Sequence, residues 1–239
     1  QMRSIPGTVA PVMEPATTKA RGGSGRARVA VLGGGTVGAQ VVSLLQGRPD
    51  TEIVGVLVRD LSKPRSFARW QELVTTDTDV IDGADVVVEA LGGVGEAGAL
   101  GLAALRAGST LVSANKAALA ERWDEFLPHL AAGRVHLEAA VMAGVPVIGS
   151  LTGALRGCAP VSVHAVLNGT CNVILSAMEE GVDYGDALAD AQRRGYAEAD
   201  PTLDVGGFDA AHKLSLLARL AFDPSLGYPE VARNTRGIS

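Results

Sequence analysis

The chain has 239 residues, of which 47% are hydrophobic and 20% are charged, a composition typical of a globular protein with a buried core. A net charge of −5 without a concentrated basic run argues against a nucleic-acid-binding surface, and no apolar stretch reaches the roughly 18 residues of a membrane span. The two cysteines, Cys158 and Cys171, form no Cys-x-x-Cys pair, and too few histidines accompany them for a zinc site. A reduced, cytoplasmic setting is therefore expected.

Residues 1–25 differ in composition from the rest of the chain. They contain Pro, Thr, Gly and Arg with little hydrophobic periodicity, which is typical of a disordered tail. The segment lacks the continuous apolar stretch of a secretion signal, and its scarcity of acids leaves a transit peptide as the alternative.

From Arg28 onward, strand-like and helix-like patterns alternate. The expected strands are short apolar runs at 29–32, 52–58, 85–90 and 110–113, and helical spacing covers 37–45 and 98–107. Such alternation predicts a doubly wound, parallel α/β sheet of the Rossmann type, and we assign it to a dinucleotide-binding domain over residues 26–130.

The pattern changes after a further helix expected at 121–133. Strand candidates at 135–141 and 161–167 are followed by helical patterns at 146–155, 172–180, 184–194 and 208–221. Strands and helices on a new sheet predict a second, α+β domain over residues 131–239, which would bind the substrate.

A glycine-rich turn lies between the first expected strand and helix. Gly33, Gly35 and Gly38 have the spacing Gly-x-Gly-x-x-Gly, in which the first glycine permits a tight turn, the second lets a pyrophosphate approach, and the third lets helix and strand pack closely. Free N–H groups at the helix start would face the phosphates. In a chain with 30 glycines a purely structural turn is the alternative, but the strand–turn–helix context favours a dinucleotide.

The end of the second expected strand indicates which dinucleotide is bound. NAD-binding domains usually place an acid there for the ribose 2′-hydroxyl, whereas an arginine accommodates the 2′-phosphate of NADP. Arg59 and Asp60 end this strand, and Lys63 and Arg65 follow. Arg59 with Lys63 or Arg65 favours NADP, while Asp60 keeps NAD as an alternative. A solvated loop of mixed charge is the other interpretation of Lys63 and Arg65.

Segment 195–213 places four acids before a lysine: Glu198, Asp200, Asp204 and Asp209, then Lys213. Asp209 and Lys213 are four residues apart and share one helix face, and the leucines that follow indicate that this helix is largely buried. A lysine beside carboxylates at its start is a candidate proton donor or substrate clamp. An exposed helical salt bridge is the alternative.

Together with further motifs, these stretches resemble the homoserine dehydrogenases, oxidoreductases that interconvert L-homoserine and L-aspartate 4-semialdehyde with NAD(P)(H) in threonine and methionine biosynthesis. The matching stretches, in family order, are 33–38, 58–63, 87–93, 113–116, 138–148, 167–170 and 198–213. The resemblance covers roughly residues 28–239, and its last stretch is the most specific.

The resemblance implies catalytic roles at named positions. Lys213 would pass a proton to or from the substrate oxygen, Asp209 would position the substrate beside it, and Lys116 would lie between cofactor and substrate. Glu198 would bind the substrate's amino group, which is reasonable chemistry because an ammonium pairs with a carboxylate. Further substrate contacts are implied for Asp204, Asn168, Gly169 and Thr170.

The resemblance also implies binding sites for the cofactor and for a monovalent cation. Cofactor contacts fall on Gly33, Gly35, Thr36, Val37, Gly38, Arg59, Lys63, Leu91, Gly92, Ser113 and Lys116. The cation loop, which acts largely through backbone oxygens, falls on Glu138, Val141, Ala143 and Val145.

This chain departs from the family in two residues and in length. Cys171 stands where the family usually has threonine, and Gly206 replaces a common glutamate. Family members continue well past the stretch 228–239, so the second domain looks C-terminally incomplete. A cytoplasmic homodimer acting on a small amino acid is the implied state; a truncated, inactive nucleotide-binding remnant or partner subunit is the alternative.

Overall fold

The computed structural model describes residues 25–238, which separate into two compact units. The first unit runs to Gly153 and the second begins at Ala154. Apart from Gly25, the expected tail lies outside the described residues. None of the helices within residues 25–238 combines the length and apolar character needed to cross a bilayer.

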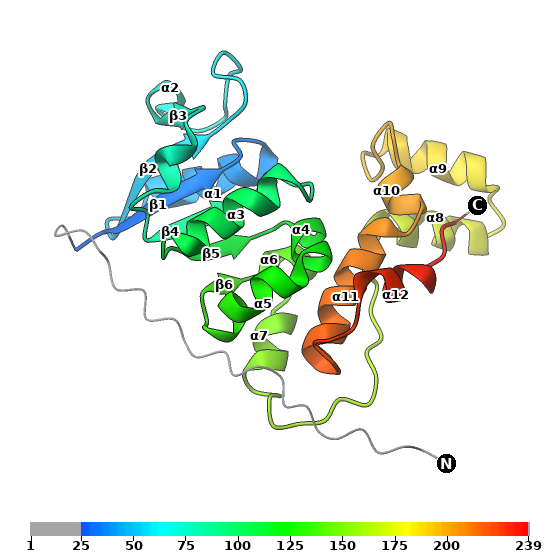
Figure 1. Cartoon of the computed structure of the whole chain (residues 1–239). Helices are drawn as coiled ribbons and strands as arrows, with labels where there is room; N and C mark the ends of the chain where they lie inside the picture. The colour runs from blue at the N-terminus through cyan, green and yellow to red at the C-terminus, as the bar shows by residue number, and fades with distance from the viewer. Residues whose placement is uncertain (1–24, 239) are drawn as a thin grey trace. The chain divides into compact units, whose positions relative to one another are not determined.

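The first unit is built on a six-stranded, fully parallel sheet (Figure 1). Its strands are β1 (Ala27–Leu32), β2 (Thr51–Leu57), β3 (Val74–Thr75), β4 (Val86–Glu89), β5 (Thr110–Ser113) and β6 (Val135–His136). Their order is β3-β2-β1-β4-β5-β6, so the direction of winding reverses between β1 and β4. The expected Rossmann-type sheet is confirmed, and ligands of such sheets bind where the winding reverses.

Helices cover this sheet because its central strands are apolar on both faces. Those of the first unit are α1 (Thr36–Gln46), α2 (Trp70–Leu73), the 3₁₀ helix η1 (Thr78–Ile81), α3 (Glu96–Arg106), α4 (Lys116–Glu121), α5 (Trp123–Ala131), α6 (Glu138–Val141) and α7 (Val147–Thr152). Val29 and Val31 of β1 form a buried cluster with Val42 of α1 and Val56 of β2. Helix α3 packs on β4 and β5.

The run at 135–141, expected to open the second domain as a strand, has a different structure. Only Val135–His136 is a strand, and it joins the first sheet, where Val135 pairs with Leu111 of β5. Residues Glu138–Val141 form α6 instead. The apolar pattern indicates that this run is buried, but it does not indicate which sheet the run joins. The first compact unit therefore extends beyond the expected limit near residue 131.

The second unit is helical within the described residues. Its helices are α8 (Gly169–Glu179), α9 (Tyr184–Arg193), α10 (Thr202–Val205), α11 (Phe208–Ala221) and α12 (Tyr228–Arg233). Helices α8 and α9 pack together around Ile174, Ala187 and Ala191, and α11 packs against α10 and α12 (Figure 1).

The strand expected at 161–167 is not formed. Its first residue, Val161, is 96% exposed, and no described segment forms a strand ladder with this run. An extended run becomes a strand only when a neighbour pairs with its N–H and C=O groups. The α+β character expected for the second domain thus stays a prediction.

Candidate active site

The glycine loop of the first unit has the geometry that its spacing predicts. Gly33 has a φ of +102°, and a Cβ atom there would lie 2.8 Å from the carbonyl oxygen of Ala90. A Cβ atom on Gly38 would lie 1.8 Å from the carbonyl oxygen of Gly33. A Cβ atom on Gly35, by contrast, would meet no atom within 4 Å. The first and third glycines are therefore needed for packing, and the second borders open space.

Helix α1 begins directly after this open space. Gly35 is its N-cap and offers no side chain to the first N–H groups, and the first turn, which includes Thr36 and Val37, holds no acidic residue. Uncapped N–H groups at a helix start bind phosphate well, since the helix dipole is positive there. These residues fit the pyrophosphate of a dinucleotide.

A cavity of about 360 Å³ opens at the carboxyl ends of β2 and β4. Arg59 lines it from the β2 side, and Leu91 and Gly92 line it from the β4 side. Gly92 and Gly93 both have a φ of +82°, and a Cβ atom on either would meet nothing within 4 Å. The expected cofactor residues Arg59, Leu91 and Gly92 thus share one cavity of the first unit.

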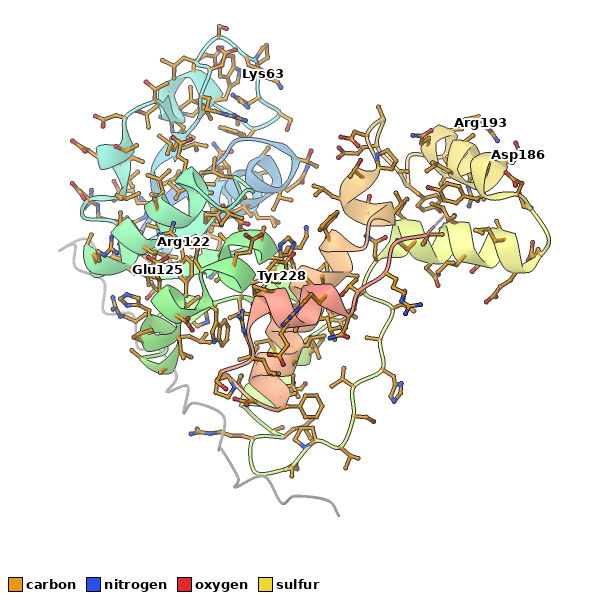
Figure 2. The ribbon with its side chains drawn as sticks, turned by 45° about the vertical axis from the view of Figure 1, so that its right-hand side comes forward. Lys63, Arg122, Glu125, Asp186, Arg193 and Tyr228 are labelled. Atoms are coloured by element: carbon orange, nitrogen blue, oxygen red, sulfur yellow. The ribbon has the colours of Figure 1, made fainter. Side chains whose placement is uncertain are left out.

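The basic residues after β2 differ in what already binds them. Arg65 donates to the carbonyl oxygens of Gly34 at 3.1 Å and Asp60 at 3.0 Å, so it ties this loop to the glycine loop. The side chains of Arg59 and Lys63 are exposed and form no hydrogen bond or ion pair within residues 25–238, and Figure 2 shows Lys63 on the outer loop after β2. Arg59 and Lys63 therefore remain available for a phosphate.

Asp60, the residue that would favour NAD, is held by its own loop. Its Oδ1 atom accepts hydrogen bonds from the Ser62 hydroxyl at 2.7 Å and from the Ser62 N–H at 2.8 Å. The Ser62 hydroxyl, with the Ser62 amide, keeps the pKa of Asp60 below its ordinary value. One carboxylate oxygen is thus already engaged in a turn.

Ser113 and Lys116 lie at the carboxyl end of β5. The buried Ser113 hydroxyl donates to Glu89 Oε2 at 2.7 Å, so it points toward the end of the neighbouring strand β4. Asn115 caps α4 by accepting from the N–H of Ala118, and Lys116 is the first residue of that helix. Glu89, at the end of an apolar strand, received no role from the sequence, although a buried acid in that position is itself a signal.

The loop expected to hold a monovalent cation lies between α6 and α7. The Glu138 carboxylate accepts from the N–H groups of Ile148 at 2.9 Å and Gly149 at 2.7 Å, so it caps α7. Val141 ends α6, and Ala143 turns the chain with a φ of +50°. The carbonyl oxygen of Val145 accepts from Val147 N–H at 2.8 Å. In residues 25–238 no three His, Cys, Asp or Glu side chains group to hold a metal ion.

In the second unit a polar cluster gathers residues from three helices. Lys213 of α11 contacts Asp209 Oδ2 at 2.8 Å, and the two side chains are 19% and 9% exposed. Asn168, the N-cap of α8, donates through Nδ2 to Asp209 Oδ2 at 3.0 Å and to Asp204 Oδ1 of α10 at 2.7 Å. The structure thus brings together four of the residues predicted to act on the substrate.

The Lys213 ammonium is oriented by two acceptors. Besides Asp209, it donates to the carbonyl oxygen of Leu167 at 2.7 Å. An ammonium has three donors, so one remains for a further oxygen. His212, the adjacent residue, stacks on the ring of Tyr228 with 4.7 Å between the ring centroids. The Asp209–Lys213 pair, in which Asp209 is buried and Lys213 is largely buried, is therefore not an exposed helical salt bridge.

Cys171 contacts this cluster without being suited to nucleophilic chemistry. Its Sγ atom donates to the carbonyl oxygen of Asp204 at 3.2 Å. Burial, followed by the negative charges of Asp204 and Asp209, raises the pKa of the Cys171 thiol. The thiolate, which is the reactive form, is disfavoured here.

The remaining residues expected to contact substrate are Gly169, Thr170 and Glu198. Gly169 is the first residue of α8. Thr170 is buried, and its hydroxyl donates to the carbonyl oxygen of Tyr196 at 2.5 Å, so this hydroxyl has a structural partner. Glu198 is exposed on the loop before α10, and no hydrogen bond or ion pair within the described part of the chain engages its carboxylate.

Comparisons with known proteins match both units to homoserine dehydrogenases. The family model for the homoserine dehydrogenase NAD-binding domain matches residues 33–147, and that for homoserine dehydrogenase itself matches residues 146–239. The homoserine dehydrogenase of Corynebacterium glutamicum is 42% identical over 223 residues, which cover 87% of this chain and 50% of that protein.

Two solved structures are similar in fold as well. A homoserine dehydrogenase from Thiobacillus denitrificans has a TM-score of 0.76 at 36% identity, covering 90% of this chain and 52% of that one. A hyperthermophilic archaeal homoserine dehydrogenase in complex with NADPH has a TM-score of 0.68 at 25% identity, covering 82% of this chain and 70% of that one. The chain spans about half the length of the curated relatives it matches.

Proposed function

Because the chain belongs to the homoserine dehydrogenase family, we propose that it catalyses the NADP-dependent interconversion of L-homoserine and L-aspartate 4-semialdehyde. The first unit is a nicotinamide-dinucleotide-binding domain of the Rossmann type. The observation that carries the proposed reaction is the cluster of Asn168, Asp204, Asp209 and Lys213, which sets one oriented ammonium among carboxylates. Threonine and methionine biosynthesis is the family's role and the context we propose for this chain.

The proposed chemistry centres on Lys213. The bound dinucleotide supplies or accepts the hydride at the substrate carbon. When the aldehyde is reduced, negative charge develops on its oxygen, and the Lys213 ammonium stabilises that charge and donates the proton that completes the alcohol. Asp209, 2.8 Å from Nζ, holds the ammonium in place. In the oxidation direction the hydroxyl proton returns to Nζ by the same path.

The cofactor proposed is NADP. The open space at Gly35 and the uncapped start of α1, at Thr36 and Val37, suit a pyrophosphate. Arg59 and Lys63 suit the 2′-phosphate, since both side chains lack partners within the described residues and an arginine binds phosphate through a charge-assisted fork. NAD is the weaker alternative because one oxygen of Asp60 is already engaged by Ser62.

Further cofactor contacts are proposed along the carboxyl ends of β4 and β5. Leu91 and Gly92 line the cavity beside Arg59. Ser113 would contribute through its backbone, because its hydroxyl is bound to Glu89. Lys116, at the start of α4, is proposed as the second lysine of the reaction.

Substrate recognition is proposed for the second unit. An amino-acid substrate carries an ammonium, which pairs best with a carboxylate. Glu198 and Asp204 are proposed for that role, Asp209 positions the substrate beside Lys213, and the first turn of α8, from Asn168 to Thr170, borders the same cluster. The division into a cofactor domain and a substrate domain follows from these assignments.

Three properties remain at the level of proposal. A monovalent cation is proposed for the loop of Glu138, Val141, Ala143 and Val145, held by backbone oxygens because the Glu138 carboxylate already caps α7. A homodimer and a cytoplasmic setting are also proposed.

The proposed function is tested by incubating the chain with L-homoserine and either NADP or NAD and following absorbance of the reduced cofactor. We expect reduction that depends on L-homoserine and is faster with NADP. A chain that binds NADPH in a fluorescence titration yet reduces neither cofactor would instead support an inactive nucleotide-binding protein.

A further inference from the structure

Strand β4 ends in a charged residue that nothing in the proposed chemistry uses. Glu89 is only 2% exposed and follows three valines. Burying a carboxylate is unfavourable unless hydrogen bonds replace the water it loses. The residues that supply those hydrogen bonds should therefore show what this acid does.

Four donors from two segments converge on the Glu89 carboxylate. Oε2 accepts from the Ser113 hydroxyl at 2.7 Å. Oε1 accepts from Leu91 N–H at 2.9 Å and, at 3.4 Å each, from Gly92 N–H and Asn115 Nδ2. An acceptor-only carboxylate matches a set made entirely of donors, whereas a neutral amide would not.

Asn115 extends this network to the start of α4. Its Nδ2 atom also donates to the carbonyl oxygen of Gly93 at 2.7 Å, and its own N–H donates to the Ser113 hydroxyl at 3.0 Å. Its Oδ1 atom accepts from Ala118 N–H at 3.1 Å and so caps the helix that begins at Lys116. One connected network thus joins the loop 91–93 to the first turn of α4.

The loop 91–93 needs such an anchor because of its glycines. Gly92 and Gly93 both adopt a φ of +82°, and their Cα atoms face open space. Consecutive glycines lose more conformational freedom on ordering than other residues. Leu91, Gly92 and Gly93 line the cavity. This side of the cavity is therefore formed before a ligand arrives only if these three residues are held in one conformation.

We propose that Glu89 is a positioning residue that fixes the loop 91–93 and the first turn of α4 as one preformed wall of the dinucleotide site. The inference rests on the proposed function, because it takes the cavity for the dinucleotide site and Lys116 for a residue of that site. Glu89 itself contacts neither cofactor nor substrate in this assignment; it acts through Leu91, Gly92 and Asn115.

A matched control lies at the other end of the same strand. Asp85, which directly precedes β4, is also a buried acid, 3% exposed, and accepts from Arg28 N–H at 2.8 Å. It is as buried as Glu89 but lies at the amino edge of the sheet, away from the loop 91–93. The Asp85→Ala variant therefore shows the general effect of removing a buried carboxylate at an end of β4.

The test compares Glu89→Ala, Glu89→Gln and Asp85→Ala in the full chain, by hydrogen exchange and by NADPH fluorescence titration. In Glu89→Ala the amides of Leu91 and Gly92 should lose protection, and NADPH should bind roughly 10–30-fold more weakly because binding must then order the glycines. Glu89→Gln keeps one acceptor oxygen and should lie between Glu89→Ala and wild type. Asp85→Ala should lower the unfolding temperature but leave loop protection and NADPH affinity unchanged.

The two readouts separate this inference from the proposed function. If wild-type chain fails to bind NADPH, the cofactor assignment fails, while hydrogen exchange still decides the role of Glu89. Unchanged protection of Leu91 and Gly92 in Glu89→Ala, or an equal loss in Asp85→Ala, would overturn the inference. Should Glu89→Ala not fold, the same comparison with Ser113→Ala, which removes the Oε2 donor, should show loss of protection at the start of α4.

Discussion

Replacing Gly35 with valine tests whether the glycine loop holds a pyrophosphate. Gly35 has φ −80° and ψ −160°, an extended conformation open to any residue, and a Cβ atom there meets nothing within 4 Å. The fold should therefore tolerate valine, at a loss of about 1 kcal/mol for an apolar residue at an N-cap. The side chain would, however, fill the open space in front of α1.

The expected loss of binding follows from the N–H groups that valine would shield. A hydrogen bond to a charged group contributes about 1.5–3 kcal/mol, so losing one such bond to phosphate weakens binding roughly 10- to 150-fold. NADPH affinity, measured by fluorescence titration, should fall by at least that factor. Thermal unfolding of the same sample should show a small change.

Two glycines of the same helix region serve as controls. Gly47→Val lies at the other end of α1, where only the carbonyl oxygen of Leu44 comes within 4 Å of the new Cβ atom, and should leave NADPH affinity unchanged. Gly38→Ala should unfold or strongly destabilise the first unit, because its Cβ atom would lie 1.8 Å from a backbone oxygen. A folded Gly35→Val chain that binds NADPH as wild type does would refute the phosphate assignment.

Three further predictions concern the cofactor, acid stability and thiol reactivity. Arg59→Ala should weaken NADP binding about 10- to 100-fold and barely change NAD binding in parallel titrations, and equal losses would make Arg59 structural. Burial, followed by the charge of Arg134, lowers the pKa of His129, whose ring nitrogen pairs with that arginine, so the stabilising neutral form is present above the ordinary value of 6.5 and lost as the pH falls through the lowered pKa. His129→Gln should therefore flatten the acid side of the urea-unfolding profile, and an unchanged profile would contradict this. Because burial raises the pKa of the Cys171 thiol, maleimide should label exposed Cys158 first near neutral pH, and equal rates would contradict the burial of Cys171.

The first unit was predictable because its signals are local. A parallel strand buried on both faces is a short apolar run, and the three glycines follow it directly at the Gly-x-Gly-x-x-Gly spacing. Close backbone contacts require Gly33 and Gly38, while Gly35 borders open space. The membership of Val135 in that sheet was missed because burial alone does not identify the pairing strand. Residues 161–167 have the composition of a strand, but pairing depends on a neighbour that no local pattern specifies.

The candidate site was predictable to the extent that its residues share an element. Asp209 and Lys213 are four residues apart on α11, so their contact follows from helix geometry. Asn168 reaches Asp204 and Asp209 across 36 and 41 residues, and only the packing of α8 against α10, and of α10 against α11, brings them together. Glu89 was overlooked because its one local signal, an acid at the end of an apolar strand, does not identify its partners. Those partners are two backbone amides and the Ser113 and Asn115 side chains, which only the fold brings together.

The most direct test of the central claim is the rate of NADPH formation from L-homoserine by wild type, Lys213→Ala and Arg193→Ala. Arg193 pairs with Asp190 on α9 of the same unit, so its variant removes an exposed ion pair outside the cluster (Figure 2). With Lys213 as the proton-transfer group, Lys213→Ala should lower kcat about 10²–10⁴-fold with NADPH affinity unchanged, while Arg193→Ala turns over normally. Full turnover by Lys213→Ala would contradict the assignment of this cluster as the active site.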